Sequence, residues 1–246
     1  MGSNSRRLSA VLVACFAWSC AEAPDLAAFE SVLAGGGVPS AALDAGTVVA
    51  GLKEALRVGT DRTVSSTSSV GGFLANELIR IHTPESLGTM TKTLRAVGMG
   101  QQVDELEVSM NRAAELAAGE ASQVFWNGIQ QMSIQDAFGI LDGGDTAATD
   151  YFRRTTSDEL RTRFGPIVEE QMGKVGLVKL YDDLVGRYRA VPFSALTDAP
   201  PDLRQHVTDG ALSGLFTVLG QEEAKIRREP AARSTDLLKK VFGTQR

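Results

Sequence analysis

From residue 47 onward, apolar residues recur every three or four positions, the spacing that places them on one face of an α-helix. The first such stripe is formed by Val48, Val49, Leu52, Leu56 and Val58. No stretch of the chain alternates β-branched and polar residues in the way that a half-buried strand does. The patch that comes nearest, residues 63–70, is rich in serine. The sequence therefore predicts an all-α fold.

Capping residues mark several of the expected helix boundaries. The candidate N-terminal caps are Ser133, Thr156 and Asp145, and residues 200–202 are expected to open a long helix. Each is followed by a helical pattern, and the first two precede an acid by three residues, as in a capping box. Residues 102–131 form either one long helix or two helices separated near Gly119, and the polar residues 61–72 are expected to form a loop. We expect eight to ten helices, packed into one bundle-like domain over residues 47–243.

The N-terminus has the pattern of a secretory signal. Arg6 and Arg7 precede an apolar stretch, residues 8–18, which is too short to span a bilayer. Two ways of processing residues 1–23 remain open: Cys20 is lipidated and becomes the first residue of the mature chain, or a soluble-type cut follows Ala21. The sequence thus predicts an exported protein, located in the periplasm or anchored to a membrane of the bacterial cell envelope through Cys20.

The segment that follows, residues 24–46, is rich in alanine, glycine and serine and is expected to be a flexible tether. Both cysteines of the chain, Cys15 and Cys20, lie within or next to the signal pattern. The helical domain therefore has no disulfide, and its stability must come from core packing. A hydrophobic content of 43% with a net charge of −5 is enough for such a core and excludes intrinsic disorder.

Several segments together resemble one bacterial family. They read GLKEAL (51–56), DELE (104–107), MNRAAE (110–115), MSIQDA (132–137), AAT (147–149), YFRRTTS (151–157), LF (215–216), EE (222–223), IR (226–227), PAAR (230–233) and LLKKVFG (237–243). In this set the chain is similar to the domain of unknown function family 4197 over roughly residues 46–243. The resemblance implies an exported or lipoprotein-like helical domain. It implies no reaction and no catalytic residues.

Several function classes lack support in the sequence. The predicted pI near 5.2 disfavours nucleic-acid binding, and no glycine-rich nucleotide motif or Gly-x-Ser-x-Gly motif is present, so no cofactor and no catalytic residue is predicted. His82 and His206 are far apart in the sequence, with no second ligand at zinc spacing. The loop from Asp142 to Asp145 lacks the alternating acids of a calcium-binding loop. No metal site is predicted.

Three polar clusters remain as candidate ligand-binding residues. They are Asn111, Arg112 and Glu115; Tyr151, Arg153, Arg154 and Thr155; and Glu222, Glu223, Arg227 and Arg233. Arg153 follows an aromatic pair and is expected to be partly buried. The clusters either form local ion pairs, converge on a cleft that binds an anionic ligand or headgroup, or supply a carboxylate pair, Glu115 and Glu222, for acid–base catalysis.

The most favoured function is non-catalytic binding of a small or lipid-like ligand, or of a protein partner, in the cell envelope. An enzyme that uses Glu and Arg groups in a helical cleft is the alternative, and a purely structural envelope protein is a third possibility. A ligand that copurifies with the protein would distinguish binding from the other two.

Overall fold

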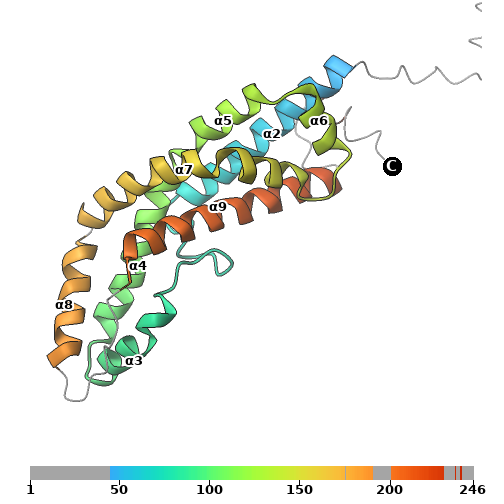
Figure 1. Ribbon diagram of the computed structural model, residues 1–246. Coiled ribbons are helices and arrows are strands. Elements are labelled where there is room, and N and C mark those ends of the chain that lie inside the picture. Colours follow the sequence, from blue (N-terminus) through green and yellow to red (C-terminus); the bar gives the residue numbers. More distant parts are fainter. Residues whose placement is uncertain (1–44, 175, 191–200, 230–235, 237–238, 240–246) are drawn as a thin grey trace, which may run out of the picture. The chain divides into compact units, whose positions relative to one another are not determined.

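The computed structural model describes residues 45–174, 176–190, 201–229, 236 and 239. The helices are α2 (Ala45–Ser68), the short 3-10 helix η1 (Glu85–Leu87), α3 (Gly88–Ala96), α4 (Gly100–Ala118), α5 (Ala121–Gln131), α6 (Ile134–Leu141), α7 (Ala147–Lys174), α8 (Leu177–Ala190) and α9 (Leu203–Arg228). No strand occurs among these residues (Figure 1). The all-α prediction is confirmed. The predicted signal, Cys20, Arg233 and most of the predicted terminal helix lie outside the described residues.

Helix α9 is the central element of the helical domain. It packs along α7 and also contacts α2 and α4. Helices α7 and α9 run antiparallel, and two ion pairs join them: Arg161 lies 3.0 Å from Asp209, and Arg204 lies 3.4 Å from Glu169. Between the helices lies one core of buried aliphatic and aromatic side chains. Its aromatic centre consists of Phe125, Phe152 and Phe216, with ring centroids 5.2 and 6.2 Å apart.

Helix α4 shows why an alanine-rich stripe favours close packing. Ala113, Ala114, Ala117 and Ala118 are all fully buried, and their small side chains let neighbouring helices approach the α4 backbone. The helical pattern breaks after Ala118, and α5 starts at Ala121. The interpretation of residues 102–131 as two helices separated near Gly119 is therefore confirmed.

The prediction of a loop over residues 61–72 is wrong for most of that range, because α2 continues to Ser68. Serine and threonine usually disfavour helix interiors, since their hydroxyls compete for backbone groups. Here the hydroxyls bond within the helix: Thr63 Oγ1 donates to Gly59 O and Thr67 Oγ1 to Thr63 O, both at 2.8 Å. Their methyl groups can then face the core together with Val64.

A capping box at Thr156 is also contradicted, because α7 runs without a break from Ala147 to Lys174. Thr156 is buried in mid-helix, and its hydroxyl donates to Phe152 O at 2.6 Å. The same residue type can cap a helix or bond back into it, and burial selects the second here. No helix among the described residues is both long and apolar enough to cross a membrane.

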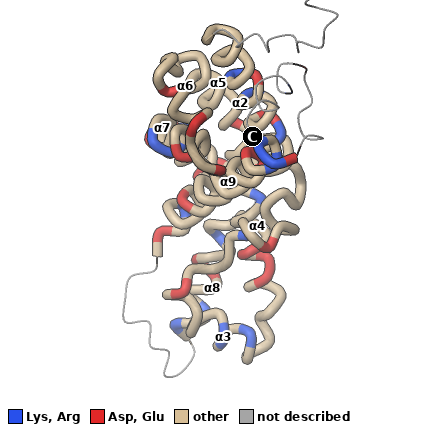
Figure 2. Tube along the Cα trace, turned by 90° about the vertical axis from the view of Figure 1, so that its right-hand side faces the viewer, with Lys and Arg blue, Asp and Glu red and all other residues tan. Residues whose placement is uncertain are grey.

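Charged residues of both signs are spread along the helices (Figure 2). Many of them pair within one turn. Arg57, for example, lies 3.0 Å from Glu54 and 2.9 Å from Asp61, and its hydrogen bond to Glu54 lowers the pKa of that carboxyl group. Such exposed pairs add little to stability.

Candidate functional site

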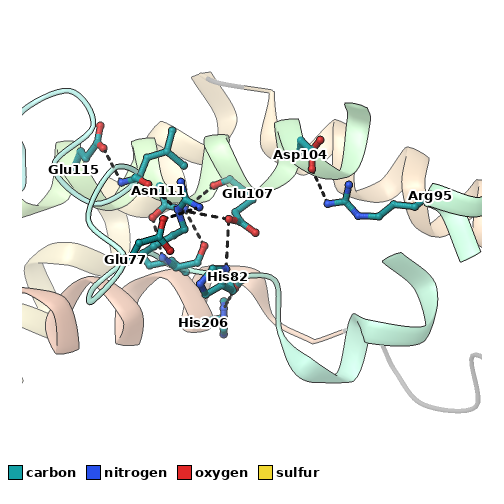
Figure 3. A network of polar contacts seen from close by, with 11 residues as sticks. Glu77, His82, Arg95, Asp104, Glu107, Asn111, Glu115 and His206 are labelled. Carbon is teal, nitrogen blue, oxygen red and sulfur yellow. Dashed lines mark hydrogen bonds and ion pairs between the residues drawn. The ribbon is translucent and has the colours of Figure 1, made fainter. Parts of the chain in front are cut away.

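A network of polar contacts, several of them buried, lies where the segment 69–84, between α2 and η1, crosses α4 and α9 (Figure 3). We call it the anchored segment. Its backbone folds into short turns, in which Arg80 N and Ile79 N donate to Asn76 O and Leu78 N donates to the Asn76 side chain. Gly71 has φ +82°, a conformation that other residues rarely adopt. Residues 69–84 thus form a compact surface loop that contains no regular helix.

Asn111 on α4 holds the anchored segment by mimicking a backbone partner. Its Oδ1 accepts from Ile81 N at 2.9 Å, and its Nδ2 donates to Ile81 O at 2.8 Å. Nδ2 also donates to Glu107 O within α4, at 2.8 Å. The side chain is 0% exposed. Because a buried amide must find partners for both ends, this residue fixes the position of Ile81 against the helix.

One turn further along α4, Glu115 holds the other end of the anchored segment. Its Oε1 accepts from Phe73 N at 3.3 Å and Leu74 N at 3.5 Å, and its Oε2 bonds Arg112 Nη1 at 3.1 Å. Glu115 is only 2% exposed, whereas the Arg112 side chain is 36% exposed. The buried carboxylate therefore has two amide donors and one guanidinium as hydrogen-bond partners.

A third group of contacts joins the segment to both helices. Arg80 donates to Leu74 O at 2.7 Å and lies 3.9 Å from Glu107, which is also 3.4 Å from His82 Nδ1. From α9, His206 Nε2 bonds His82 O at 2.8 Å. The fold thus brings together the two histidines of the chain, which are 124 positions apart. Figure 3 shows them beside Glu107.

On its inner side the anchored segment packs against glycines of α9. Phe73, Ile79 and Ile81 are buried. A Cβ atom on Gly210 would lie 2.9 Å from Ile81, and one on Gly214 would lie 2.5 Å from the Phe73 ring. The absence of side chains at these two positions therefore creates the space that the segment fills.

On its outer side the same segment exposes two large apolar side chains. Val70 is 84% and Leu78 is 72% exposed. Ala75 and Glu77 between them are exposed as well. Neither Val70 nor Leu78 gains stability from burial in this chain, although the backbone that carries them is held in place at several points.

The second predicted cluster divides between two faces of α7. Arg153 is exposed, with its guanidinium 4.8 Å from the centroid of the Phe216 ring on α9, so the expectation of partial burial is not met. Arg154 is exposed on the side of Tyr151, 5.8 Å from that ring. Tyr151 is buried and donates to Gly128 O at 3.1 Å. Burial raises the pKa of its phenol.

The third cluster joins three helix ends. Glu223 on α9 accepts from Ala148 N at 2.9 Å and from the amide and hydroxyl of Thr149 at 2.8 Å, so it caps the N-terminus of α7. Arg227 bonds Glu223 at 2.9–3.0 Å and donates to Ile140 O at the end of α6, at 2.7 Å. Both carboxylate oxygens of Glu223 thus accept hydrogen bonds, as expected of an ion pair that stabilises the fold.

Glu222, by contrast, bonds Lys225 at 2.6 Å and lies 3.9 Å from Arg62. Glu115, the other carboxylate of the pair predicted for acid–base catalysis, has different hydrogen-bond and ion-pair partners. The three clusters thus occupy three places, on α4, on α7 and at the end of α9. Arg233 lies outside the described residues.

Sequence reasoning missed Arg80, Glu107, His82 and His206 as parts of one network. No local pattern joins them, because they come from the anchored segment, α4 and α9. Chemically, Glu107 can orient the imidazole of His82, as carboxylates do in acid–base pairs. Among the described residues no three or more His, Cys, Asp or Glu side chains gather as a metal site would require.

Comparison with known families identifies the family of the chain. A family model described as protein of unknown function (DUF4197) matches residues 42–243. The chain belongs to this family, as the sequence segments suggested. No curated protein and no solved structure matches it.

Proposed function

We propose that this member of the DUF4197 family is an exported, non-catalytic binding domain of the bacterial cell envelope, and that the anchored segment is the surface through which it binds a protein partner. The observation that carries the proposal is the contrast between the two sides of this segment. Its backbone is bonded to buried Asn111 and Glu115, while Leu78 and Val70 point into solvent.

Rigidity supports a recognition role. Fixing an irregular loop costs conformational entropy, and here several side chains of α4 and α9 are committed to doing so. A loop that is ordered before binding loses less freedom when a partner arrives, so more of the contact energy appears as affinity. Fixed loops on a rigid scaffold are also where proteins commonly place recognition residues.

The exposure of Leu78 indicates the kind of partner. A side chain that is 72% exposed does not line a pocket of its own protein. It can instead enter an apolar pocket on another protein, where burying such a side chain contributes about 1.5–3 kcal/mol. Hence a protein partner fits this surface better than a small ligand does.

Export is supported by the sequence alone. Residues 1–23 carry the positive and apolar regions of a secretory signal, and the domain that follows them has the composition of an independently folding unit. Placement in the periplasm or on a membrane through Cys20 is part of the proposal.

Site-specific photo-crosslinking tests the binding surface. A photoreactive phenylalanine analogue replaces Leu78 in cells of the native host, and the matched control carries it at Ile134, which is 64% exposed on α6. We expect a crosslinked product of defined mass from position 78 and not from position 134. A Val70→Ser substitution in the position-78 chain should reduce its yield. Equal products from both positions, or none from position 78, would refute the proposal.

An enzyme is the alternative, and one observation favours it. Glu107 lies 3.4 Å from Nδ1 of His82, whose side chain is 62% exposed, so an oriented imidazole is open to solvent. An activity in the cell envelope that is lost in His82→Gln but kept in Leu78→Ser would support the enzyme over the binding domain.

A further inference from the structure

A polar groove, lined by no residue of the anchored segment, lies between α5, α6 and α7. Its volume is about 310 Å³, which is in the range of small-molecule sites. The polar side chains that line it and carry the argument are Asn127, Asp136, Tyr151, Arg154, Thr155 and Glu159. They come from three different helices, so the groove is a product of the packing and not of one sequence motif.

Arg154 supplies the positive charge of the groove. Within the described part of the chain it forms no ion pair with a carboxylate closer than 4 Å, and its guanidinium lies near the face of Tyr151. The hydroxyl of Tyr151 is directed to Gly128 O. Arg153, the next residue, lies on the α9 side against Phe216. Two neighbouring arginines therefore differ in surroundings, and only one of them reaches the groove.

Two carboxylates supply acceptor atoms to the same groove. Both bonds that Asp136 accepts from Ser133 end on Oδ2, and both bonds that Glu159 accepts from Arg163 end on Oε1. The other oxygen of each, Oδ1 and Oε2, has no hydrogen-bond donor among the described residues. The hydrogen bonds from Ser133 also lower the pKa of Asp136, so this carboxylate is charged at neutral pH.

We propose that this groove binds a small zwitterion, an amino acid or a short peptide, with its carboxylate on Arg154 and its ammonium group on Asp136 and Glu159. A guanidinium offers paired donors to a carboxylate, and the two free carboxylate oxygens accept from an ammonium group. A ligand with negative charge alone would meet repulsion from Asp136 and Glu159. A ligand with positive charge alone would meet repulsion from Arg154. Only a molecule that carries both satisfies the whole lining.

The test uses probes that differ in one charge. The purified protein is titrated with each common amino acid and with glycylglycine, and binding is followed by ¹⁵N NMR shifts. For glycylglycine and the tightest amino acid, the N-acetylated form removes the ammonium charge and the C-terminal amide removes the carboxylate. We expect saturable binding of at least one zwitterion, weakened by about tenfold or more when either charge is blocked.

Matched variants locate the site. Arg154→Gln should weaken the zwitterion and the N-acetylated form, but leave the amide form unchanged, whereas Arg153→Gln should leave all three unchanged. Asp136→Asn keeps an oxygen for Ser133 and should weaken the forms that carry an ammonium group. The proposal is overturned if no probe binds saturably, if blocking a charge changes nothing, or if Arg153→Gln and Arg154→Gln have equal effects.

Discussion

At the scale of single residues, burial separates structural polar groups from available ones. Asn111, Glu115 and Glu223 look in the sequence like ordinary helix-surface residues, yet all three are buried and bonded to backbone amides of another segment. Arg153 and Arg154 follow two buried aromatic residues and are exposed. The chemical type of a side chain therefore says less about its role than the element that packs against it.

Three arginines of the predicted clusters, Arg112, Arg153 and Arg227, should differ in their effect on stability. Arg227 is 11% exposed and pairs with the buried Glu223. Arg227→Gln leaves that buried carboxylate without its counter-charge and removes the hydrogen bond to Ile140 O, so it should cost about 3 kcal/mol of unfolding free energy. Arg153→Gln removes an exposed contact with Phe216 and should cost under about 1 kcal/mol. Arg112→Gln should lie between them, since Glu115 is buried but the Arg112 side chain is 36% exposed and solvent screens its charge.

Urea unfolding of the three variants measures these costs. The order Arg227, Arg112, Arg153 is the expected result. If Arg153→Gln were the most damaging of the three, the contacts described for Arg227 would not be the ones that stabilise the ends of α6 and α7.

The cap at Ser133 predicts a pH dependence. Ser133 Oγ accepts from Asp136 N at 3.0 Å, and both its hydroxyl and its amide donate to the Asp136 carboxylate. Ser133→Ala should cost about 1 kcal/mol at neutral pH. Because the hydrogen bonds hold the pKa of Asp136 below its usual 3.8, their stabilisation is present above that pH and is lost as the pH falls through the folded-state value.

The difference in melting temperature between wild type and Ser133→Ala should therefore shrink as the pH is lowered from 5 toward 2. Ser157→Ala serves as the control, since the Ser157 hydroxyl bonds only a backbone carbonyl in its own helix. A difference for Ser133→Ala that stays constant over this range would show that the charged form of Asp136 is not involved.

At the scale of elements, the sequence predicted those boundaries that depend on local chemistry. Ser133 caps α6 as expected, and the helix expected to open at residues 200–202 is α9, which Asp202 caps. Gly119 separates α4 from α5. The errors at residues 61–72 and at Thr156 share one cause. A threonine hydroxyl can cap a helix or bond back into it, and the choice depends on whether the residue faces a core formed by distant parts of the chain.

Two glycines of α9 offer a matched test of the packing against the anchored segment. In a helix interior, Gly→Ala usually stabilises by about 1 kcal/mol. Gly220→Ala should do so in part, because its Cβ would lie no closer than 3.7 Å to Thr149. Gly214→Ala should instead destabilise by about 1–3 kcal/mol, because its Cβ would lie 2.5 Å from the Phe73 ring.

Adding Phe73→Leu to Gly214→Ala should recover part of the loss if the ring is the obstacle. Free energies of unfolding from denaturant titrations decide the matter. Equal effects of the two alanine substitutions would mean that the anchored segment does not press on α9 at Gly214.

At the scale of the whole molecule, fold class and family could be predicted and the sites could not. Asn111 meets Ile81, Glu223 meets Ala148, and His206 meets His82, over separations of 30, 75 and 124 positions. No short pattern encodes such pairs. Only residues 69–72 of the anchored segment fall within the predicted loop 61–72, and the sequence does not show which side of the segment faces the core.

Export belongs to this scale as well. Expressed in a Gram-negative host, the precursor should lose about 2 kDa when its signal is removed. If Cys20 is lipidated, Cys20→Ala should move the protein from the membrane fraction to the soluble periplasm, whereas Cys15→Ala should leave it in the membrane. Mass spectrometry and cell fractionation give both answers. Wild-type protein found soluble in the periplasm would refute lipidation, and a precursor of unchanged mass would refute export.

The central position of α9 has a consequence for how the chain is made. This helix begins only at Leu203, yet α2, α4 and α7 all pack against it, and His206, Gly210 and Gly214 form the wall for the anchored segment. A growing polypeptide therefore exposes the apolar faces of its early helices until nearly all of it has left the ribosome. During that interval the uncovered apolar faces make the nascent chain prone to aggregation.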